Sequence, residues 1–321
     1  MRIDTPNLKK QPLSAILWFV FNALASATSI IAFIQFEKFI PEGPKGYVYA
    51  CGLVLITSLS IGYAIFLQRK KLHRYADIAI YFHFVNHTVR DTLTWVRNRI
   101  RNNQFSEDDF EEIDLATNSI VDAIAGCFSV LTGTQCGVCI KEFADGLSLR
   151  VALRDSLSKM TRGKPDPQRQ PHPITEDTPC NNVFFGADSC LRSFCSNDVV
   201  SLWRINKYSS PSFEIYGGPP ETFTLFGHRF VKGWKLHYKS TLASPIRFMR
   251  NRMNTSKLTI SENPANSEFH YWGFLCVDAK KRHVFDIHRH PDVIAAFSDC
   301  LYIYFSELYD SLEDYKAAKK S

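Results

Sequence analysis

Two apolar runs without a charged residue, 13–36 and 47–67, constrain the fold of this chain more than any other feature of its sequence. At a helical rise of about 1.5 Å per residue, each run is long enough to cross the hydrocarbon core of a bilayer. Only ten residues, 37–46, separate the runs, and they include two prolines and two glycines that favour a turn. We therefore predict a transmembrane helical hairpin over 13–67, which follows a short tail at 1–12.

The basic residues near the two runs predict which side of the membrane each terminus occupies. Cations precede the first run and follow the second, at Arg2, Lys9, Lys10, Arg69, Lys70, Lys71 and Arg74. By the positive-inside rule, both termini are expected in the cytoplasm of a multi-pass protein of the plasma or inner membrane, with the lipid bilayer as a partner. The small residues Ala23, Ala25 and Ala27 leave open one alternative, a cleaved signal peptide.

The cysteines indicate the cellular compartment, and the distribution of basic residues bears on one class of partner, nucleic acid. Nine cysteines, an odd number scattered through apolar segments, are typical of a reducing compartment rather than of a disulfide framework. This usage agrees with a cytosolic domain after residue 67. The formal net charge is +6, but the excess is divided between the membrane flanks and the loop at 159–169. We therefore expect no nucleic-acid partner, because such a partner requires a clustered basic surface.

A predicted amphipathic helix connects the membrane segment to the rest of the chain. Residues 68–101 lack Gly and Pro, and their apolar positions recur at steps of three or four. The apolar seam comprises Tyr75, Ile78, Phe82, Val85, Val89, Leu93, Val96 and Ile100. Because the seam is narrow and the other faces are polar, we predict that the connecting helix at 68–105 pairs with a twin helix as a coiled coil in a homodimer. The alternative is that this helix packs on its own domain.

The pattern after this helix predicts an α/β domain over 106–321. Helical periodicity continues at first, and from Gln135 it changes to the period of two that is typical of strands. We expect a first helix that ends at Leu131 and has Ser106 as its N-cap, and then a strand hairpin that begins at Gln135 and turns at Asp145-Gly146. Further strands are expected at 240–246 and 271–277, and a last helix at 291–309. The segments 155–179 and 209–232 are expected to be loops.

Two short motifs in this region resemble those of a known family. Ser-Thr-Leu-Ala-Ser-Pro-Ile stands at 240–246, and Gly-Phe-Leu-Cys-Val-Asp stands at 273–278. With their order, spacing and flanking helices, they make residues 106–315 resemble a GAF domain. The resemblance implies an α/β module with a central antiparallel sheet, helices on one face and a ligand pocket on the other. It also implies dimerisation through the first and last helices.

The resemblance does not identify a ligand or a cofactor. Cyclic-nucleotide-binding GAF domains carry an Asn-Lys pair, a Phe and an Asp-Glu pair, of which residues 280–286 keep a Lys and the Phe. A pocket lined by cations and aromatic rings would suit a small anionic ligand that carries a ring. The candidate ligand-binding residues are Arg192, Trp203, Arg204, Lys239 and Arg247.

Other residues of chemical interest are assigned structural roles. Cys136 and Cys139 form a Cys-x-x-Cys, but residues three apart on a strand point to opposite faces, so we expect core packing rather than a metal site. Cys190 and Cys195 leave open a thiol-dependent enzyme, as in GAF relatives that reduce methionine sulfoxide. The chain has no nucleophile elbow, phosphate-binding loop, kinase signature or paired zinc motif. We therefore predict no catalytic residue, no metal and no enzyme activity.

Together these features predict a membrane-anchored sensory protein. A small molecule would bind the GAF-like domain and shift a two-state packing of the connecting helices, and this shift would reach the membrane hairpin. The alternative is a membrane scaffold without a ligand, in which the GAF-like fold serves dimerisation and partner docking. Stabilisation of the protein by a ligand would distinguish the two.

Overall fold

The chain forms two compact units, Met1–Lys71 and Leu72–Ser321. The computed structural model describes residues 44–320, with gaps at 145–147, 162–169, 175–177, 185–192, 250–260 and 263–268. The first predicted membrane run, the turn at Asp145-Gly146, Cys190 and the candidate ligand residue Arg192 lie outside the described residues.

One long helix, α2 (Pro44–Arg101), contains both the second predicted membrane run and the connecting segment. It begins at a proline, which is favourable there because the first N–H groups of a helix have no helical partner. The large apolar side chains that the structure describes between 48 and 67 are exposed, and Leu59, for example, is 64% exposed. An uninterrupted helix therefore carries the chain from the predicted membrane segment into the second unit.

Helix α3 (Asp109–Thr132) is, by length and composition, the one helix in the described part of the chain that is apolar enough to cross a membrane. Its apolar face is buried, and Ile120 and Ile124 are completely covered. This burial identifies α3 as a core helix of the second unit. The multi-pass arrangement of residues 13–67 stays a prediction.

The turn between α2 and α3 is held by one carboxylate. Helix α3 begins at Asp109 rather than with Ser106 as its N-cap, which corrects the predicted boundary. The Ser106 N–H donates to Asp109 Oδ2 at 2.8 Å, and Arg99 Nη2 donates to Asp109 Oδ1 at 2.8 Å. At its other end, α3 stops at Gly133, whose φ of 64° is the left-handed conformation of a helix C-cap.

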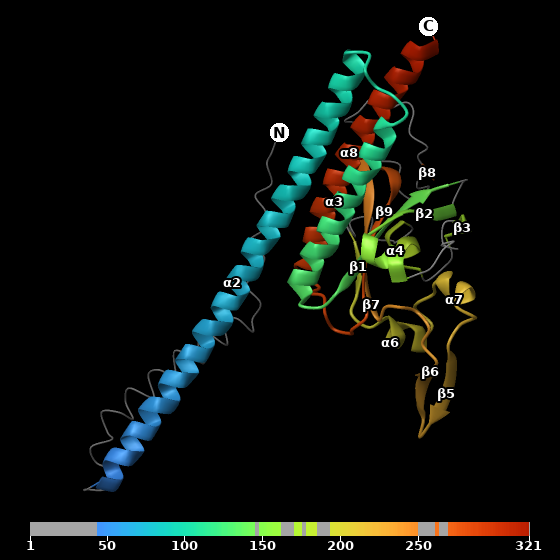
Figure 1. The fold of residues 1–321 in the computed structure, drawn as a ribbon. Coiled ribbons are helices and arrows are strands. Elements are labelled where there is room, and N and C mark those ends of the chain that lie inside the picture. The colour runs from blue at the N-terminus through green and yellow to red at the C-terminus, as the bar shows by residue number, and fades with distance from the viewer. Residues whose placement is uncertain are drawn as a thin grey trace. The chain divides into compact units, whose positions relative to one another are not determined.

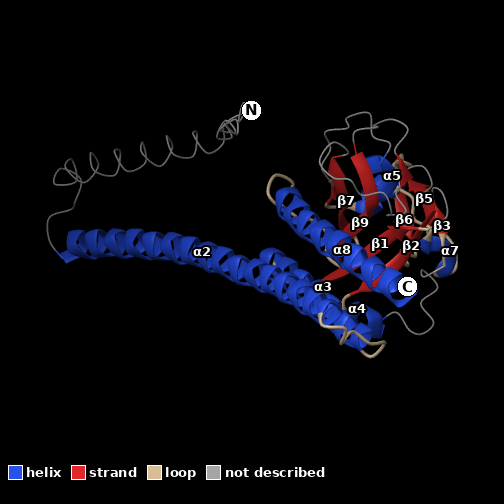
Figure 2. Ribbon diagram, turned by 90° about the horizontal axis from the view of Figure 1, so that it is seen from above, coloured by secondary structure: helices blue, strands red, loops and turns tan. Residues whose placement is uncertain are grey.

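The second unit is built on an antiparallel sheet with the strand order β3-β2-β1-β9-β7-β4 (Figure 2). The strands are β1 (Cys136–Phe143), β2 (Ser148–Arg154), β3 (His172–Pro173), β4 (Phe194–Ser196), β7 (Ser240–Met249) and β9 (Phe269–Ala279). A short strand, β8 (Ser261–Glu262), pairs with β9 beyond the end of β1. The predicted hairpin of β1 and β2 and the two predicted later strands are confirmed.

A bulge in β9 decides which side chains face each side of the sheet. Ile246 of β7 lies opposite Gly273, but the next residue of β7 lies opposite Tyr271, so Trp272 is an extra residue. Trp272 therefore packs on the helix side, where it stacks on Phe305 with a centroid distance of 4.3 Å. Tyr271 faces the opposite side of the sheet.

The helices lie on one side of this sheet. Helices α3 and α8 (His290–Lys320) cover the face, and α8 extends beyond the predicted end at Tyr309. The Leu72–Arg101 part of α2 packs beside both helices (Figure 1). Phe82 of α2 contacts Phe297 of α8 with a ring-centroid distance of 5.3 Å. The side chain of Tyr81 lies next to Gly126 of α3.

The packing of α2 corrects the predicted coiled coil. Val85, Val89, Leu93 and Val96 are buried in the core that α2 shares with α3 and α8. These seam residues are covered by their own chain, so they do not form a seam with a twin helix. The alternative, that the connecting helix packs on its own domain, is correct for this segment. A homodimer stays a prediction.

The two segments that the sequence predicted as loops contain α4 (Ser156–Thr161), α7 (Ser212–Ile215) and the hairpin of β5 (Glu221–Leu225) and β6 (His228–Lys232). Two further short helices, α5 (Pro179–Phe184) and α6 (Val199–Arg204), lie between these segments. The β5–β6 hairpin turns at Phe226-Gly227, both with positive φ, and Phe226 is 91% exposed. The prediction of a loop at 209–232 is wrong because a Phe-Gly turn lacks the usual Asn-Gly or Asp-Gly signal.

Candidate functional site

A small cavity lies on the sheet face opposite the helices, and polar side chains from several segments line it. Its volume is about 40 Å³. The strands contribute Cys139, Lys141, Arg154, Thr241, Cys276 and Asp278. The edge strand β3 contributes His172, and segments that cover the sheet contribute Cys180, Ser210 and Tyr238, among others.

Strand alternation explains why these side chains share one face. In β1, Val138 and Ile140 belong to the helix-side core, whereas Cys139 and Lys141 line the cavity. Successive side chains of a strand point to opposite faces, so one strand supplies both the core and the site. In β9, Cys276 lines the cavity in the same way.

Two cations give the cavity its charge. Arg154 is only 4% exposed, and Lys141 has no carboxylate partner within ion-pair distance among the described residues. Burial lowers the pKa of Lys141, but the nearby thiols of Cys180 and Cys276 outweigh it and raise the pKa, so the ammonium stays protonated. Burial, together with the charge of Lys141, lowers the pKa of His172 to about 4. The cavity therefore brings two cations, Lys141 and Arg154, and one carboxyl group, Asp278, together around a neutral imidazole.

A neutral tyrosine wall borders the cavity, in which Tyr238 lines the cavity and the buried Tyr208 contacts Tyr238 from the neighbouring aromatic cluster. The hydroxyl groups of Tyr208 and Tyr238 lie 2.7 Å apart, and Ser210 Oγ lies 3.4 Å from the Tyr238 hydroxyl. Burial raises the pKa of Tyr238 to about 12, so its phenol keeps its proton. The wall can thus both donate and accept hydrogen bonds without adding charge.

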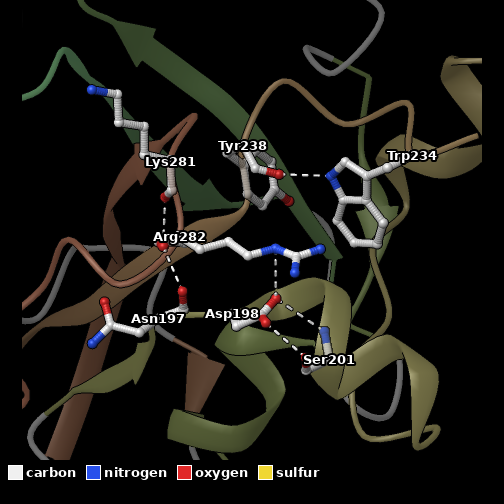
Figure 3. Close-up of polar contacts among 8 residues, drawn as sticks. Asn197, Asp198, Ser201, Trp234, Tyr238, Lys281 and Arg282 are labelled. Atoms are coloured by element: carbon white, nitrogen blue, oxygen red, sulfur yellow. Dashed lines mark hydrogen bonds and ion pairs between the residues drawn. The ribbon is translucent and has the colours of Figure 1, made fainter. Parts of the chain in front are cut away.

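One hydrogen bond anchors Tyr238, and a polar network around Asp198 lies nearby (Figure 3). Trp234 Nε1 donates to the carbonyl oxygen of Tyr238 at 2.8 Å. Nearby, Asp198 accepts from the backbone N–H and the hydroxyl of Ser201 at 3.1 and 2.7 Å. The same carboxylate pairs with Arg282 Nε at 3.3 Å, which ties the start of α6 to the loop after β9.

The residues that partly match the cyclic-nucleotide signature belong to this network rather than to the cavity. The Asn197 amide donates to the Phe285 carbonyl oxygen at 2.6 Å and accepts from the Phe285 N–H at 2.7 Å. Ser240 Oγ donates to the carbonyl oxygens of Asn197 and Lys281, each at 2.8 Å (Figure 3). Because the Phe285 side chain packs in the helix-side core, this segment serves the fold.

Three thiols form a hydrogen-bonded chain in the cavity. Cys139 of β1 lies directly opposite Cys276 of β9, and Cys180 reaches them from α5. The hydrogen bond to Cys276, followed by burial, raises the pKa of Cys139. The hydrogen bond from Cys276 lowers the pKa of Cys180, and the charge of Lys141 adds to this effect against burial. Negative charge in this chain is therefore favoured at Cys180.

The described residues contain no group of three or more His, Cys, Asp or Glu side chains arranged to hold a metal ion. The predicted division of the Cys-x-x-Cys is confirmed, because Cys136 packs in the helix-side core and Cys139 lines the cavity. Cys195 also packs against the helix-side core, and burial raises its pKa to about 11.

The candidate ligand residues in the described part of the chain lie outside this cavity. Trp203 packs on Phe213 in a separate aromatic cluster, with a centroid distance of 4.8 Å. The side chains of Arg204 and Lys239 are exposed. Arg247 donates to the hydroxyl of Tyr271 at 3.1 Å. Their role in ligand binding stays a prediction.

Sequence reasoning missed Lys141, Arg154 and Cys180. One signal for Lys141 was available, because the alternation of β1 places it on the face of Cys139 and away from Val138 and Ile140. The position of Cys180 had no comparable signal, since a short helix after an irregular segment can lie on either side of a sheet.

No protein-family model and no curated protein matches this chain. Among solved structures, it is similar to a far-red cyanobacteriochrome photoreceptor, with 12% identity and a TM-score of 0.38 over 65% of this chain and 98% of that one. It is similar to the GAF domain of an Acinetobacter phosphoenolpyruvate-protein phosphotransferase, with 11% identity and a TM-score of 0.34 over 68% and 93%. It is also similar to fRMsr of Staphylococcus aureus, with 12% identity and a TM-score of 0.31 over 66% and 94%.

Similarities at these TM-scores assign no function to the chain. Its own geometry, however, has the arrangement of sheet, helices and cavity that the sequence resemblance implied. The sheet is antiparallel, helices cover one face, and a polar cavity lies on the other. The Leu72–Ser321 unit has a GAF-like fold.

Proposed function

We propose that the Leu72–Ser321 unit is a sensor domain that binds a small oxyanion beside Lys141 and Arg154. The observation that carries this proposal is the protonated ammonium of Lys141, which lines a cavity without a carboxylate partner among the described residues. A charge removed from water is costly unless it is paired, so an anion in the cavity would stabilise this arrangement. The guanidinium of Arg154 adds donors whose geometry suits carboxylate or phosphate oxygens.

The size of the cavity limits the class of ligand. Pockets for drug-sized molecules have volumes of about 300–1,000 Å³, whereas this cavity measures about 40 Å³. A cyclic nucleotide or another ring-bearing anion is too large for it. Inorganic phosphate or a carboxylate with few heavy atoms is the proposed ligand, smaller than the ring-bearing anion expected from the sequence.

The fold offers a direct route from the cavity to the helices. Lys141 lines the cavity, and its neighbour Ile140 packs in the core that contains α3, α8 and the seam of α2. A ligand that shifts β1 would therefore alter the packing of these helices. Such a ligand changes the population of two packings in proportion to its preference for one of them.

Membrane anchoring through α2 is part of the proposal. The exposed apolar side chains of α2 between 48 and 67, Leu59 among them, would be unfavourable in water and favourable in lipid. Beyond this segment, Ile80 of α2 is 65% exposed and Leu115 of α3 is also exposed, which leaves apolar surface for a second copy of the chain. We therefore retain a membrane-anchored homodimer as the proposed assembly.

The proposal predicts that oxyanion binding depends on Lys141. The full-length protein in detergent should be stabilised by phosphate or a small carboxylate, as measured by its thermal unfolding temperature across a concentration series. In the Lys141→Met variant, loss of a charged hydrogen bond worth about 1.5–3 kcal/mol should weaken the apparent affinity about 10- to 100-fold. Without an anion, this variant should unfold at the same temperature as the wild type or higher, because a half-buried charge without a carboxylate partner in the described part of the chain is gone.

The matched control is Lys239→Met, which removes the same charge from an exposed position. It should bind the anion as the wild type does. If no oxyanion stabilises the wild-type protein, sensing through this cavity is refuted, and the scaffold without a ligand is favoured. If Lys239→Met weakens binding and Lys141→Met does not, the ligand site lies at the residues that the sequence alone proposed.

The membrane proposal predicts the fractionation and the topology of the full-length chain. Expressed in bacterial cells, the protein should remain with membranes after an alkaline carbonate wash. Protease added outside intact spheroplasts should leave the Leu72–Ser321 unit uncut, and the same protease should cut it once detergent opens the membrane. Recovery of the protein in the soluble fraction without detergent, or cleavage of that unit in intact spheroplasts, would contradict the proposed anchoring and orientation.

A further inference from the structure

The thiol chain in the cavity has no part in the proposed oxyanion binding, yet its arrangement is specific. Cys139 and Cys276 are register partners on adjacent antiparallel strands, and directly opposite residues of such strands have Cα atoms about 4.5–5.5 Å apart. Cys180, in α5, lines the same cavity of about 40 Å³ as these two cysteines. All three cysteines thus line one small cavity together with Lys141.

We infer that this cluster is a peroxide-reactive site, in which Cys180 is the attacking thiol and Cys276 is the thiol that closes a Cys180–Cys276 disulfide. The inference does not require the proposed oxyanion, because the reactants are the two thiols and a hydroperoxide. The reaction is stoichiometric and leaves the protein in an oxidised state, so it adds a redox input to the same domain.

The assignment of roles follows from the environment of each sulfur. A thiolate is the reactive form of cysteine, and it is favoured by a hydrogen-bond donor and a nearby cation. Cys180 has both, since Cys276 donates to it and Lys141 lies beside it. The buried Cys127 and Cys136 lack a cation among the influences on them, and burial raises their pKa to about 12 and about 11. They therefore serve as internal references for unreactive thiols.

The first step transfers oxygen to sulfur. The Cys180 thiolate attacks one oxygen of the hydroperoxide, an S–O bond forms, and the O–O bond breaks. The departing oxygen takes a proton from solvent and leaves as water or as an alcohol. Cys180 is then a sulfenic acid, and the peroxide has gained two electrons.

The second step forms the disulfide. The sulfur of Cys276 attacks the sulfur of Cys180, an S–S bond forms, and the S–O bond breaks. The hydroxide leaves with the proton of Cys276 as water, so two thiols and one hydroperoxide give one disulfide, one alcohol or water, and one further water. The bond would join α5 to β9 and remove the thiolate beside Lys141.

The test maps the oxidised cysteines in the full-length, reduced protein in detergent. The protein is treated with a small excess of hydrogen peroxide in a buffer free of phosphate and carboxylates, and remaining thiols are blocked with N-ethylmaleimide. Peptide mass spectrometry should show a linked pair of peptides that contain Cys180 and Cys276. Because the buffer holds no oxyanion, this result is independent of the Lys141→Met binding experiment.

Variants separate the two roles. Cys180→Ser should abolish formation of the linked peptides, whereas Cys276→Ser should leave a sulfenic acid at Cys180 that dimedone traps. Lys141→Met should slow the reaction about tenfold if the thiol pKa rises by one unit. The matched control, Cys127→Ser, should react as the wild type does.

Three results would overturn the inference. One is a wild-type protein whose cavity cysteines all remain labelled by N-ethylmaleimide after peroxide. A second is a disulfide between Cys139 and Cys276 with Cys180 unmodified. The third is oxidation confined to Cys51 and Cys300. Each of these is read from the wild-type protein, so none depends on a variant that fails to fold.

Discussion

The Val96→Asp variant is expected to lose more than about 3 kcal/mol of the free energy of unfolding of the Leu72–Ser321 unit. Val96 is 0% exposed and lies in the core that α2 shares with α3 and α8. A carboxylate there would be removed from water without a partner. Thermal unfolding of the full-length protein in detergent, followed by near-ultraviolet circular dichroism, measures the loss.

The control for this variant is Thr94→Asp, which introduces the same charge two residues away on an exposed side of α2. Its free energy of unfolding should stay within about 0.5 kcal/mol of the wild type. If Val96→Asp were as stable as Thr94→Asp, the α2 seam would not belong to the domain core. The predicted coiled coil with a twin helix would then be the better interpretation of residues 68–105.

The Gly273→Ala variant is expected to separate β9 from β1. A Cβ atom at this position would overlap with the carbonyl oxygen of Lys141 and lie 3.0 Å from the Cα atom of Glu142. Both contacts are backbone atoms of β1, so the strands must move apart. We expect a loss of about 3 kcal/mol, of the size seen when a packed interior is overfilled. The unfolding temperature measures it.

The same substitution should also affect the site, because the displaced residue is Lys141. Oxyanion affinity of Gly273→Ala should fall even at temperatures where the protein remains folded. The control is Gly62→Ala, where an added Cβ meets nothing within 4 Å. Wild-type stability in Gly273→Ala would show that β1 and β9 can separate without cost, which contradicts the close register described here.

These predictions rest on the same structural relation, in which β1 and β9 carry the cavity on one face and the helix-side core on the other. A sensor built in this way does not need a separate output element at its ligand site. The proposed oxyanion and the proposed disulfide both act on β1, β9 or α5, so either input would reach α3 and α8 through the strands between them. Each input can be tested in the absence of the other.

Several parts of the fold were predictable from periodicity. The strands at 240–246 and 271–277 and the hairpin that begins near Gln135 were expected because period-two patterns of apolar residues are visible without tertiary information. Shorter elements such as the β5–β6 hairpin were missed, since its strands are short and largely exposed and its Phe-Gly turn lacks the usual hairpin signal. The helix boundary at Ser106 was misplaced because Asp109 caps the turn through Arg99, a residue on the preceding helix.

The candidate site was less predictable than the fold. The residues chosen from the sequence, such as Arg204 and Lys239, were cations near the expected ligand side, but local sequence does not say which cation is buried. Lys141 and Arg154 lie on strands whose pattern showed only that one face is apolar. Cys139, Cys180 and Cys276 are far apart in the chain, and only the pairing of β1 with β9 and the position of α5 bring them together.

The sequence by itself determined the class of this protein: an apolar N-terminal region, a continuous helix after it, and an antiparallel α/β domain with unpaired cysteines. The apolar region, the helix and the α/β class follow from local hydrophobic periodicity, which each segment carries alone. The cysteine prediction came from their odd number and scatter, and the antiparallel sheet from the resemblance to GAF domains. The tertiary structure decided that the seam of α2 belongs to its own domain and that Lys141 meets three thiols in one cavity. Such contacts depend on which faces of distant segments pack together. That packing is determined by the hydrophobic core as a whole and not by any one segment.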